Sequence, residues 1–232
     1  MVKITHIESF CNESVGFVCV TDETGAQGWG QVSTYHSDIT CQVLHRQVAP
    51  WVLGVETEDF DDLLDLVTER EHKFPGSYLR RALGGFDTAV WDMWGKQQGK
   101  PVVELLGGTP GKLRAYASSM KRDITPKDEA DRLTRLRDEV GFDAFKVRAG
   151  AEVGRDKDEW PGRTEEIIAT MRKTMGDNVA LLIDANSCYS PKRAIEVGQL
   201  LKEHRFSHYE EPCPYWELEQ TKQVTEALDI DV

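Results

Sequence analysis

The pattern of apolar and polar residues changes character along this chain. Near the start, short runs rich in Ile, Val and Phe alternate with polar residues, which is typical of half-buried strands. Apolar residues then recur every three to four positions, which is typical of amphipathic helices. The pattern predicts an antiparallel meander at residues 2–10, 16–21 and 28–32, followed by helices at residues 38–53, 59–67 and 78–97.

The third predicted helix carries a glycine pair in its interior. Glycine lowers helix stability by roughly 1 kcal/mol relative to alanine, so we expect Gly84 and Gly85 to permit close packing against a neighbouring element. A short apolar turn at residues 101–108 closes this region. Pro110 and Gly111 then predict a domain boundary, which divides the chain into residues 1–111 and 112–232.

Beyond this boundary the pattern becomes a strict alternation of strands and helices. Four βα units in succession predict a parallel sheet. A (β/α)₈ barrel needs eight such units and about 250 residues, so the segment is either a small open sheet or the first half of a barrel. The predicted strands are residues 113–118, 144–148, 179–184 and 207–210, and the predicted helices are residues 126–140, 164–174, 191–204 and 216–227.

The composition of the chain argues against several kinds of partner and site. The chain has 40 acidic and 28 basic residues and a net charge of -12, which argues against a nucleic-acid backbone or an anionic membrane as the main partner. Its five cysteines show no CxxC spacing, so we expect neither a disulfide framework nor a zinc cluster. Reduced thiols, no signal-peptide pattern and no apolar run near the length of a membrane span predict a cytoplasmic protein.

The candidate chemistry lies where the predicted parallel strands end, because active sites of βα folds form there. Lys146 and Arg148 end the second strand of this region and are two residues apart, so both point to the same face. Two cations on one inner face need negative charge nearby, which a carboxylate substrate or a carboxylate–metal site would supply. An exposed pair on an edge strand is the alternative.

Carboxylates end the next two strands. Asp184 follows an apolar run, and we expect it to be exposed at the strand tip, either as a functional group or as a turn residue. Glu210 comes one βαβ repeat later, at the equivalent tip of the neighbouring strand. Its neighbour Glu211 should point to the opposite face, so only one of the two should join the site. Two hard oxygen ligands in this arrangement suit Mg²⁺.

Several segments together resemble the enolase superfamily, in its mandelate racemase and muconate lactonizing enzyme branch. Residues 81–96, 99–102 and 105–108 look like the end of its capping domain, and three strand motifs follow in the family's order. The resemblance spans essentially the whole chain. The three motifs are Lys146-Val147-Arg148, Asp184-Ala185-Asn186 and Glu210-Glu211-Pro212.

The resemblance implies an α+β capping domain followed by the first half of a (β/α)₈ barrel. It implies that Asp184 and Glu210 are metal ligands for Mg²⁺, and that Lys146 and Arg148 are the basic catalytic positions. The activity implied is abstraction of the proton α to the carboxylate of a small-molecule substrate, in a protein that forms homo-oligomers when full length. Asn186 and the loop residue His36 are further candidates for contact with substrate.

Two departures from the family pattern shape the expected reaction. The third carboxylate ligand and the His or Lys acid–base groups of the family would lie beyond Val232, so we expect the chain to be a fragment of a longer protein. Arg148 stands where the family usually has a catalytic lysine, and a guanidinium is a poor general base. We therefore favour dehydration of an acid sugar, which needs one base. Racemisation or epimerisation on the same scaffold, or a catalytically inactive chain, are the alternatives.

Overall fold

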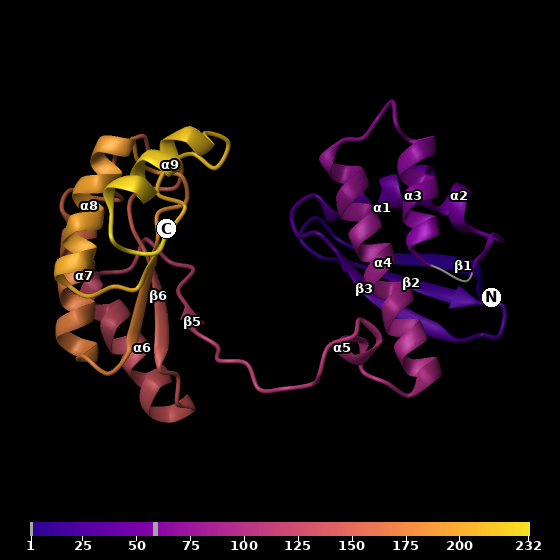
Figure 1. Ribbon diagram of the computed structural model, residues 1–232, viewed down its shortest axis with the longest axis horizontal. Coiled ribbons are helices and arrows are strands. Elements are labelled where there is room, and N and C mark those ends of the chain that lie inside the picture. Colours follow the sequence, from indigo (N-terminus) through magenta and orange to yellow (C-terminus); the bar gives the residue numbers. More distant parts are fainter. Residues whose placement is uncertain (1, 58–59) are drawn as a thin grey trace. The chain divides into compact units, whose positions relative to one another are not determined.

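The computed structural model describes residues 2–57 and 60–232, except for the side chains of Val2 and Thr57. The chain divides into two compact units, Met1–Lys112 and Leu113–Val232. The first is drawn in indigo to magenta and the second in salmon to yellow in Figure 1. The division falls one residue from the predicted boundary, and each unit has its own apolar core.

The first unit contains a four-stranded antiparallel sheet in the order β3-β2-β1-β4. The predicted meander is present with nearly the predicted limits, because alternating apolar residues on β1 and β2 supply one buried face. Ile4, Val18 and Val20 lie in the core of this unit. The strands are β1 (Val2–Cys11), β2 (Gly16–Asp22), β3 (Gln27–Val32) and β4 (Glu56–Thr57).

The helix predicted at residues 38–53 is interrupted in the structure. It consists of α1 (Ser37–Val43), a π-helical turn η1 (Leu44–Val48) and α2 (Ala49–Val52). Pro50 has no N–H to donate to the preceding turn, so a regular helix cannot run through this point. The remaining helices are α3 (Asp61–Arg70), α4 (Ser77–Gln98) and α5 (Val102–Leu105), and the predicted start of α3 at residue 59 lies outside the described residues.

Helix α4 packs on β2 and β3 (Figure 1), and glycines set how closely. A Cβ atom added at Gly30 of β3 would lie 2.0 Å from the carbonyl oxygen of Gly85, and one added at Gly85 would meet Val32. Gly84 has open space around it. The expectation of close packing is therefore right for Gly85 and wrong for Gly84.

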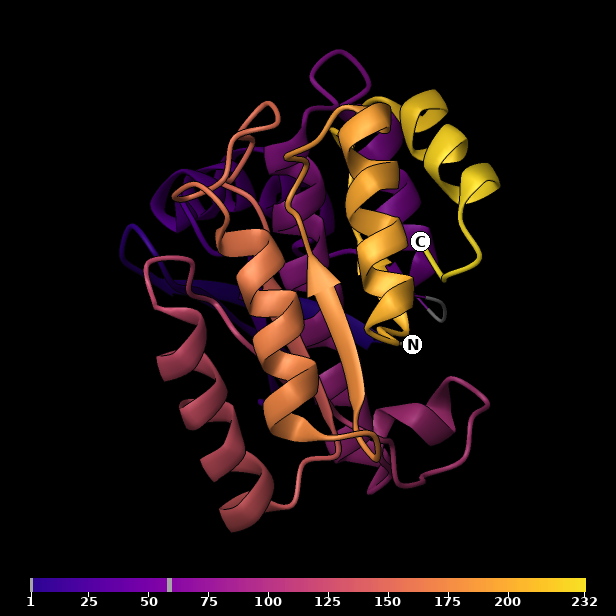
Figure 2. The same ribbon diagram turned by 90° about the vertical axis from the view of Figure 1, so that its left-hand side faces the viewer.

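The second unit is a parallel sheet in the order β5-β6-β7-β8, built from four βα units in succession. Helices α6, α7 and α8 lie side by side against it (Figure 2). The predicted fold class, an α+β unit followed by parallel βα units, is confirmed. The elements are β5 (Ala117–Ser118), α6 (Pro126–Val140), β6 (Ala144–Arg148), α7 (Arg163–Met175), β7 (Ala180–Asp184), α8 (Pro191–Glu203), β8 (His208–Glu210) and α9 (Leu218–Ala227).

The parallel pairing continues past β8. Asp231 forms a parallel bridge with His208, and its carbonyl oxygen accepts a hydrogen bond of 2.8 Å from the amide of Tyr209. Ile230 and Val232 pack against the core of this unit. The last residues therefore occupy the next strand position of the sheet. Within the described residues, no helix has the length and apolar character required to cross a membrane.

Candidate metal and substrate site

Three candidate residues lie level with one another at the carboxyl ends of adjacent strands. Arg148 of β6 pairs in register with Asp184 of β7, which pairs with Glu210 of β8. Residues at the same level of neighbouring parallel strands point to the same face of the sheet. The structure therefore brings these side chains together, and Lys146, two residues before Arg148, joins them.

Asp184 lies at the centre of this cluster. Its carboxylate accepts hydrogen bonds from the guanidinium of Arg148 and from the backbone amide of Asn186, the latter at 2.8 Å. The ammonium of Lys146 lies 3.6 Å from it. The expectation that Asp184 is exposed is wrong: the residue is only 1% exposed, because the side chains of the adjacent strand and loop cover it. A buried carboxylate requires such positive and N–H partners.

Lys146 connects the two carboxylates. It is 5% exposed, and its Nζ donates to Glu210 and lies near Asp184. Its ammonium also lies 5.3 Å from the ring centre of Tyr116, a cation–π contact. Burial acts to lower the pKa of Lys146, but the hydrogen bond to Glu210 and the charges of both carboxylates outweigh it and raise the pKa. The lysine is thus held as a cation.

Arg148 is fixed on several sides. Its Nε donates to the carbonyl oxygen of Ser119 at 2.9 Å, and its Nη1 donates to Asp184 and to Oδ1 of Asn186, the latter at 2.8 Å. The residue is 7% exposed. A guanidinium held in this way presents a positive charge in a fixed position next to the carboxylates.

Asn186 and Glu211 extend the cluster. Asn186 adopts a left-handed backbone conformation (φ 41°), and its Nδ2 donates to Oε2 of Glu211 at 3.3 Å. Glu211 also has a positive φ of 44°, so the chain leaves the strand after Glu210 and strand alternation no longer applies. That only one of the two glutamates joins the site stays a prediction: Glu210 contacts Lys146, whereas the exposed Glu211 contacts Asn186.

Arg122 is a member of the cluster that the sequence reasoning missed. It lies in the loop between β5 and α6, and its guanidinium donates to Oδ1 of Asn186 and to the carbonyl oxygen of Gly150, the latter at 3.1 Å. Burial and the neighbouring charge of Arg148 lower its pKa. The signal was present: the rule that chemistry follows strand ends applies to the first parallel strand as well as to the next three.

His36 is in the N-terminal unit. It is exposed, has a left-handed backbone conformation (φ 54°) and precedes α1 without a capping hydrogen bond from its side chain. Its role in substrate contact stays a prediction.

The residues present fit a hard divalent cation. The carboxylates of Asp184 and Glu210 both contact the ammonium of Lys146, so they converge on a position that already accommodates positive charge. Oxygen ligands of this kind suit Mg²⁺, which takes one or two protein carboxylates and retains water. Among residues 2–57 and 60–232, no group of three or more His, Cys, Asp or Glu side chains has metal-binding geometry. The described residues therefore offer a partial ligand set.

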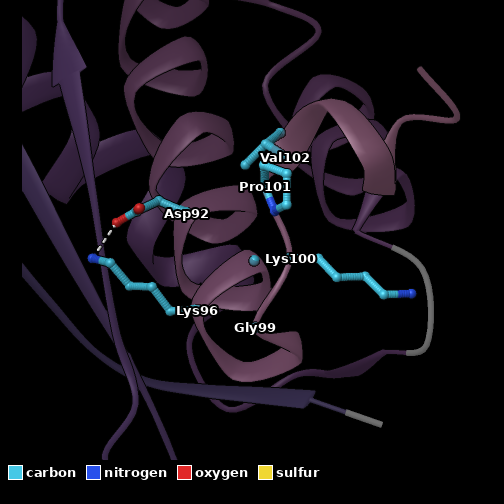
Figure 3. Close-up of a pocket in the computed structure, with 7 residues that line it drawn as sticks. Asp92, Lys96, Gly99, Lys100, Pro101 and Val102 are labelled. Carbon is cyan, nitrogen blue, oxygen red and sulfur yellow. Dashed lines mark hydrogen bonds and ion pairs between the residues drawn. The ribbon is translucent and has the colours of Figure 1, made fainter. Parts of the chain in front are cut away.

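A separate hollow of about 320 Å³ lies at the end of α4 in the N-terminal unit (Figure 3). Asp92 on its wall accepts hydrogen bonds from the amide of Trp29 at 2.8 Å and from the ammonium of Lys96 at 2.6 Å. The first bond joins α4 to β3, and the second pairs the charges of Asp92 and Lys96 within α4.

Comparison with known families accounts for both units. The family model described as the N-terminal domain of mandelate racemase / muconate lactonizing enzyme matches residues 3–107. The model described as enolase C-terminal domain-like matches residues 128–232. The chain belongs to the mandelate racemase and muconate lactonizing enzyme branch of the enolase superfamily. In this branch the parallel unit corresponds to the first half of a (β/α)₈ barrel, which decides between the two predicted architectures.

Solved structures of this branch superpose closely. A protein from Roseobacter denitrificans, provisionally described as a racemase, has a TM-score of 0.96 and 76% identity, with 99% of this chain and 63% of that chain covered. A mandelate racemase/muconate lactonizing protein from Paracoccus denitrificans PD1222, complexed with magnesium, has a TM-score of 0.90 and 29% identity. That match covers 99% of this chain and 64% of the other.

A curated relative adds a named activity. The D-gluconate/D-galactonate dehydratase of Picrophilus torridus is 36% identical over 214 residues, which cover 87% of this chain and 52% of the relative. The chain thus spans about half the length of the curated relatives it matches.

Proposed function

We propose that the whole protein is a Mg²⁺-dependent acid-sugar dehydratase. The observation that carries this proposal is the alignment of Arg148, Asp184 and Glu210 at the same level of three adjacent strands, with Lys146 joining the two carboxylates. The curated relative named D-gluconate/D-galactonate dehydratase and the neighbour complexed with magnesium support the same reading.

The roles of the residues follow from their contacts. Asp184 and Glu210 would hold the metal. When bound, Mg²⁺ would neutralise the substrate carboxylate and the negative charge that develops once the α proton leaves. Lys146 and Arg148 add fixed positive charge on the same face, which lowers the energy of that charge further. Asn186 keeps Arg148 and Asp184 in place through hydrogen bonds to both.

The register of the last strand position fixes where a further ligand from that strand would stand. His208 pairs with Asp231, and Glu210 is two residues beyond His208. The residue opposite Glu210 would therefore be the first one after Val232. A carboxylate there would complete three oxygen ligands at one level of the sheet.

The presence of Arg148 in the site is more compatible with dehydration than with racemisation. Removal of the α proton and loss of the β-hydroxyl, which leaves with a proton as water, give an enol that tautomerises to a 2-keto-3-deoxy acid. One base that later protonates the leaving group is enough for this reaction. Racemisation requires a base on each face of the substrate, and Arg148 is a permanently charged guanidinium in the place of one of them.

The test is a product assay on the full-length protein with a panel of aldonates and aldarates, with Mg²⁺ and with excess EDTA. We expect a 2-keto-3-deoxy acid from at least one acid sugar, only when Mg²⁺ is present. Turnover that is equally fast in EDTA would overturn the role of the metal.

A racemase or epimerase is the second candidate, favoured by the provisional description of the 76% identical neighbour. It predicts solvent deuterium at the α carbon of recovered substrate and no keto product. That result with the same panel would replace the dehydratase proposal.

A further inference from the structure

Two cysteine side chains of the N-terminal unit, Cys11 and Cys41, lie together where β1 meets α1. Cys11 ends β1 and pairs with Gly16 of β2 in the antiparallel ladder. Residues directly opposite in such a ladder point to the same face of the sheet, with Cβ positions about 5 Å apart. A Cβ atom added at Gly16 would lie 3.2 Å from Sγ of Cys41. Because Gly16 has no side chain, the thiol of Cys41 lies over it, next to the side chain of Cys11.

The spacing of a neighbouring contact supports the same pairing. Ser9, two residues before Cys11, shares a hydrogen bond of 2.9 Å with Nε2 of His45, four residues after Cys41. Two residues of a strand span about 6.6 Å, and four residues of a helix span about 6 Å, so the two contacts lie side by side. The strand and the helical segment therefore meet at Ser9 and His45, and again at Cys11 and Cys41.

The two thiols differ in exposure and in acidity. Cys11 is exposed, whereas Cys41 is only 3% exposed. Burial and the contact with Cys11 raise the pKa of the Cys41 thiol to about 11, although the hydrogen bond with Ser9 acts in the opposite direction. The thiolate is the reactive form of cysteine. Cys11 is therefore the thiol that an oxidant in solution meets first, and Cys41 is the neighbour that reacts with it afterwards.

A packing role explains Cys41 but does not explain Cys11. A buried cysteine behaves as a small apolar residue, and Cys41 belongs to the apolar core of this unit. All five cysteines lie in the part of the chain that the structure describes, and Cys11 is the exposed one. An accessible thiol with a second thiol beside it is typical of a redox-sensitive cysteine with its resolving partner.

From this geometry we propose that Cys11 and Cys41 form a redox-modification site, at which hydrogen peroxide converts the two thiols into an intramolecular disulfide. Cys11 attacks one oxygen of the peroxide, which forms an S–O bond, breaks the O–O bond and releases water, so that Cys11 becomes a sulfenic acid. Sγ of Cys41 then attacks Sγ of Cys11, which forms the S–S bond and breaks the S–O bond. The leaving hydroxide takes up the thiol proton of Cys41 as a second water, and the two thiols supply the two electrons that reduce the peroxide.

The disulfide would tie the loop at residues 12–15 to α1. The carbonyl oxygen of Glu13 in this loop already accepts a hydrogen bond of 3.2 Å from the amide of Ser37, the first residue of α1. His36, a candidate for contact with substrate, lies immediately before that helix. Oxidation would therefore restrain the loops on both sides of this contact. The inference rests on the N-terminal unit alone and does not depend on the proposed reaction.

The test treats the native full-length protein with hydrogen peroxide, blocks the remaining thiols with iodoacetamide in denaturant and maps the peptides by mass spectrometry. We expect a peptide pair that joins Cys11 to Cys41, with a mass lower by two hydrogen atoms than that of the reduced pair. Dithiothreitol should reverse the change. Cys19→Ala is the matched control, since it removes another cysteine of the same unit and should leave the disulfide unchanged.

Cys41→Ala separates the two steps. Without the second thiol, the sulfenic acid of Cys11 should accumulate and react with dimedone, whereas the wild type should give little adduct because Cys41 consumes the sulfenic acid. Cys11→Ser, which changes an exposed side chain, should show neither the adduct nor the linked peptide. The peptide map of the wild type decides the question by itself if Cys41→Ala, a substitution in the core, does not fold.

Absence of the linked peptide from the oxidised wild type would overturn the inference. Oxidation of Cys11 to a sulfinic acid, or to a disulfide between two chains, in place of the link to Cys41 would also overturn it. Equal labelling of the wild type and Cys41→Ala by dimedone would show that Cys41 does not react with Cys11, and would contradict the second step.

Discussion

The two units of this chain bury different kinds of side chain. Among the described residues, the N-terminal unit buries few polar groups besides Asp22, Ser37 and Thr40, and its core is apolar. The C-terminal unit has an apolar core between sheet and helices, yet it also buries charged groups at the strand ends. These are Lys146, Arg148 and Asp184, and the helices of the same unit bury Arg163, Arg172 and Glu129 as well.

Backbone conformation shows the same contrast. Non-glycine residues with a left-handed φ gather in the loops after the parallel strands, including Asp156, Asn186, Ser187 and Glu211. Such conformations are unfavourable for most residues and persist where the surroundings hold them. The difference teaches that the first unit buries mainly apolar side chains, while the second holds buried charge and left-handed backbone at one edge of its sheet, where the proposed active site lies.

The largest effect should come from removing one charge of the cluster. Asp184→Asn keeps the size of the side chain and removes the carboxylate that Arg148 and Lys146 contact. We expect kcat/KM of the full-length protein to fall about 10³-fold or more. The reason is that a weakly held Mg²⁺ would no longer stabilise the negative charge that develops on the substrate in the transition state. Asp177→Asn is the matched control, since its carboxylate is exposed and pairs with Arg205 on the surface. Comparable activity in both variants would remove Asp184 from the site.

The second effect concerns packing in the N-terminal unit. Gly30→Ala would place a Cβ atom 2.0 Å from the carbonyl oxygen of Gly85 and 2.8 Å from the amide nitrogen of Ala89. Because these are backbone atoms of α4, the helix must move, and we expect a loss of about 3 kcal/mol in the free energy of unfolding. Hydrogen exchange should localise the loss to β3 and α4. Unchanged exchange there would show that the contact is looser than described.

A third, smaller effect tests Asp22, the one buried carboxylate among the described residues of that unit. Asp22 accepts hydrogen bonds from Thr24 at 2.8 and 2.7 Å, from Ala26 at 3.0 Å and from the side chain of Gln97 at 2.6 Å. Burial acts to raise the pKa of Asp22, but these hydrogen bonds outweigh it and lower the pKa.

A lowered pKa in the folded state means that the ionised group adds stability above its unfolded pKa, near 3.9, and that this stability is lost as pH falls through the folded value. We expect Asp22→Asn to lower the free energy of unfolding by about 1–2 kcal/mol at pH 7, and the difference from wild type to shrink below about pH 4. Denaturant unfolding at pH 7 and pH 3 measures both. A difference that does not depend on pH would contradict this origin.

The smallest effect should be a gain. Gly84 lies in the exposed part of α4 with open space where a Cβ atom would be, so Gly84→Ala should stabilise the unit by about 0.5–1 kcal/mol through helix propensity. Thermal unfolding beside Gly30→Ala provides the comparison within one helix–sheet contact. A destabilised Gly84→Ala protein would mean that this face of α4 is covered by another element.

The strongly patterned elements could be predicted from the sequence. Helix α6 has the predicted limits because Thr125 caps its first turn, Pro126 begins it and Gly141 ends it in a left-handed conformation. Strand β6 also has the predicted limits. The strand predicted at residues 113–118 is only Ala117–Ser118, since Leu113 is 93% exposed and only these two residues pair with β6.

Only some residues of the candidate site could be predicted from the sequence. Lys146, Arg148, Asp184 and Glu210 end recognisable strands, so the topology alone brings them together. Arg122 follows a strand of two residues, and Glu211 reaches Asn186 only because of its left-handed backbone. Contacts that depend on loop conformation leave no periodic signal in the sequence.

The central claim, that the strand-end carboxylates form a metal centre, is tested most directly by calorimetric titration of Mg²⁺ into the full-length protein and three variants. The account predicts one Mg²⁺ per chain in the wild type and in Asp177→Asn, and affinity reduced about 10- to 100-fold or more in Asp184→Asn and Glu210→Gln. Equal Mg²⁺ affinity in all four proteins would contradict it.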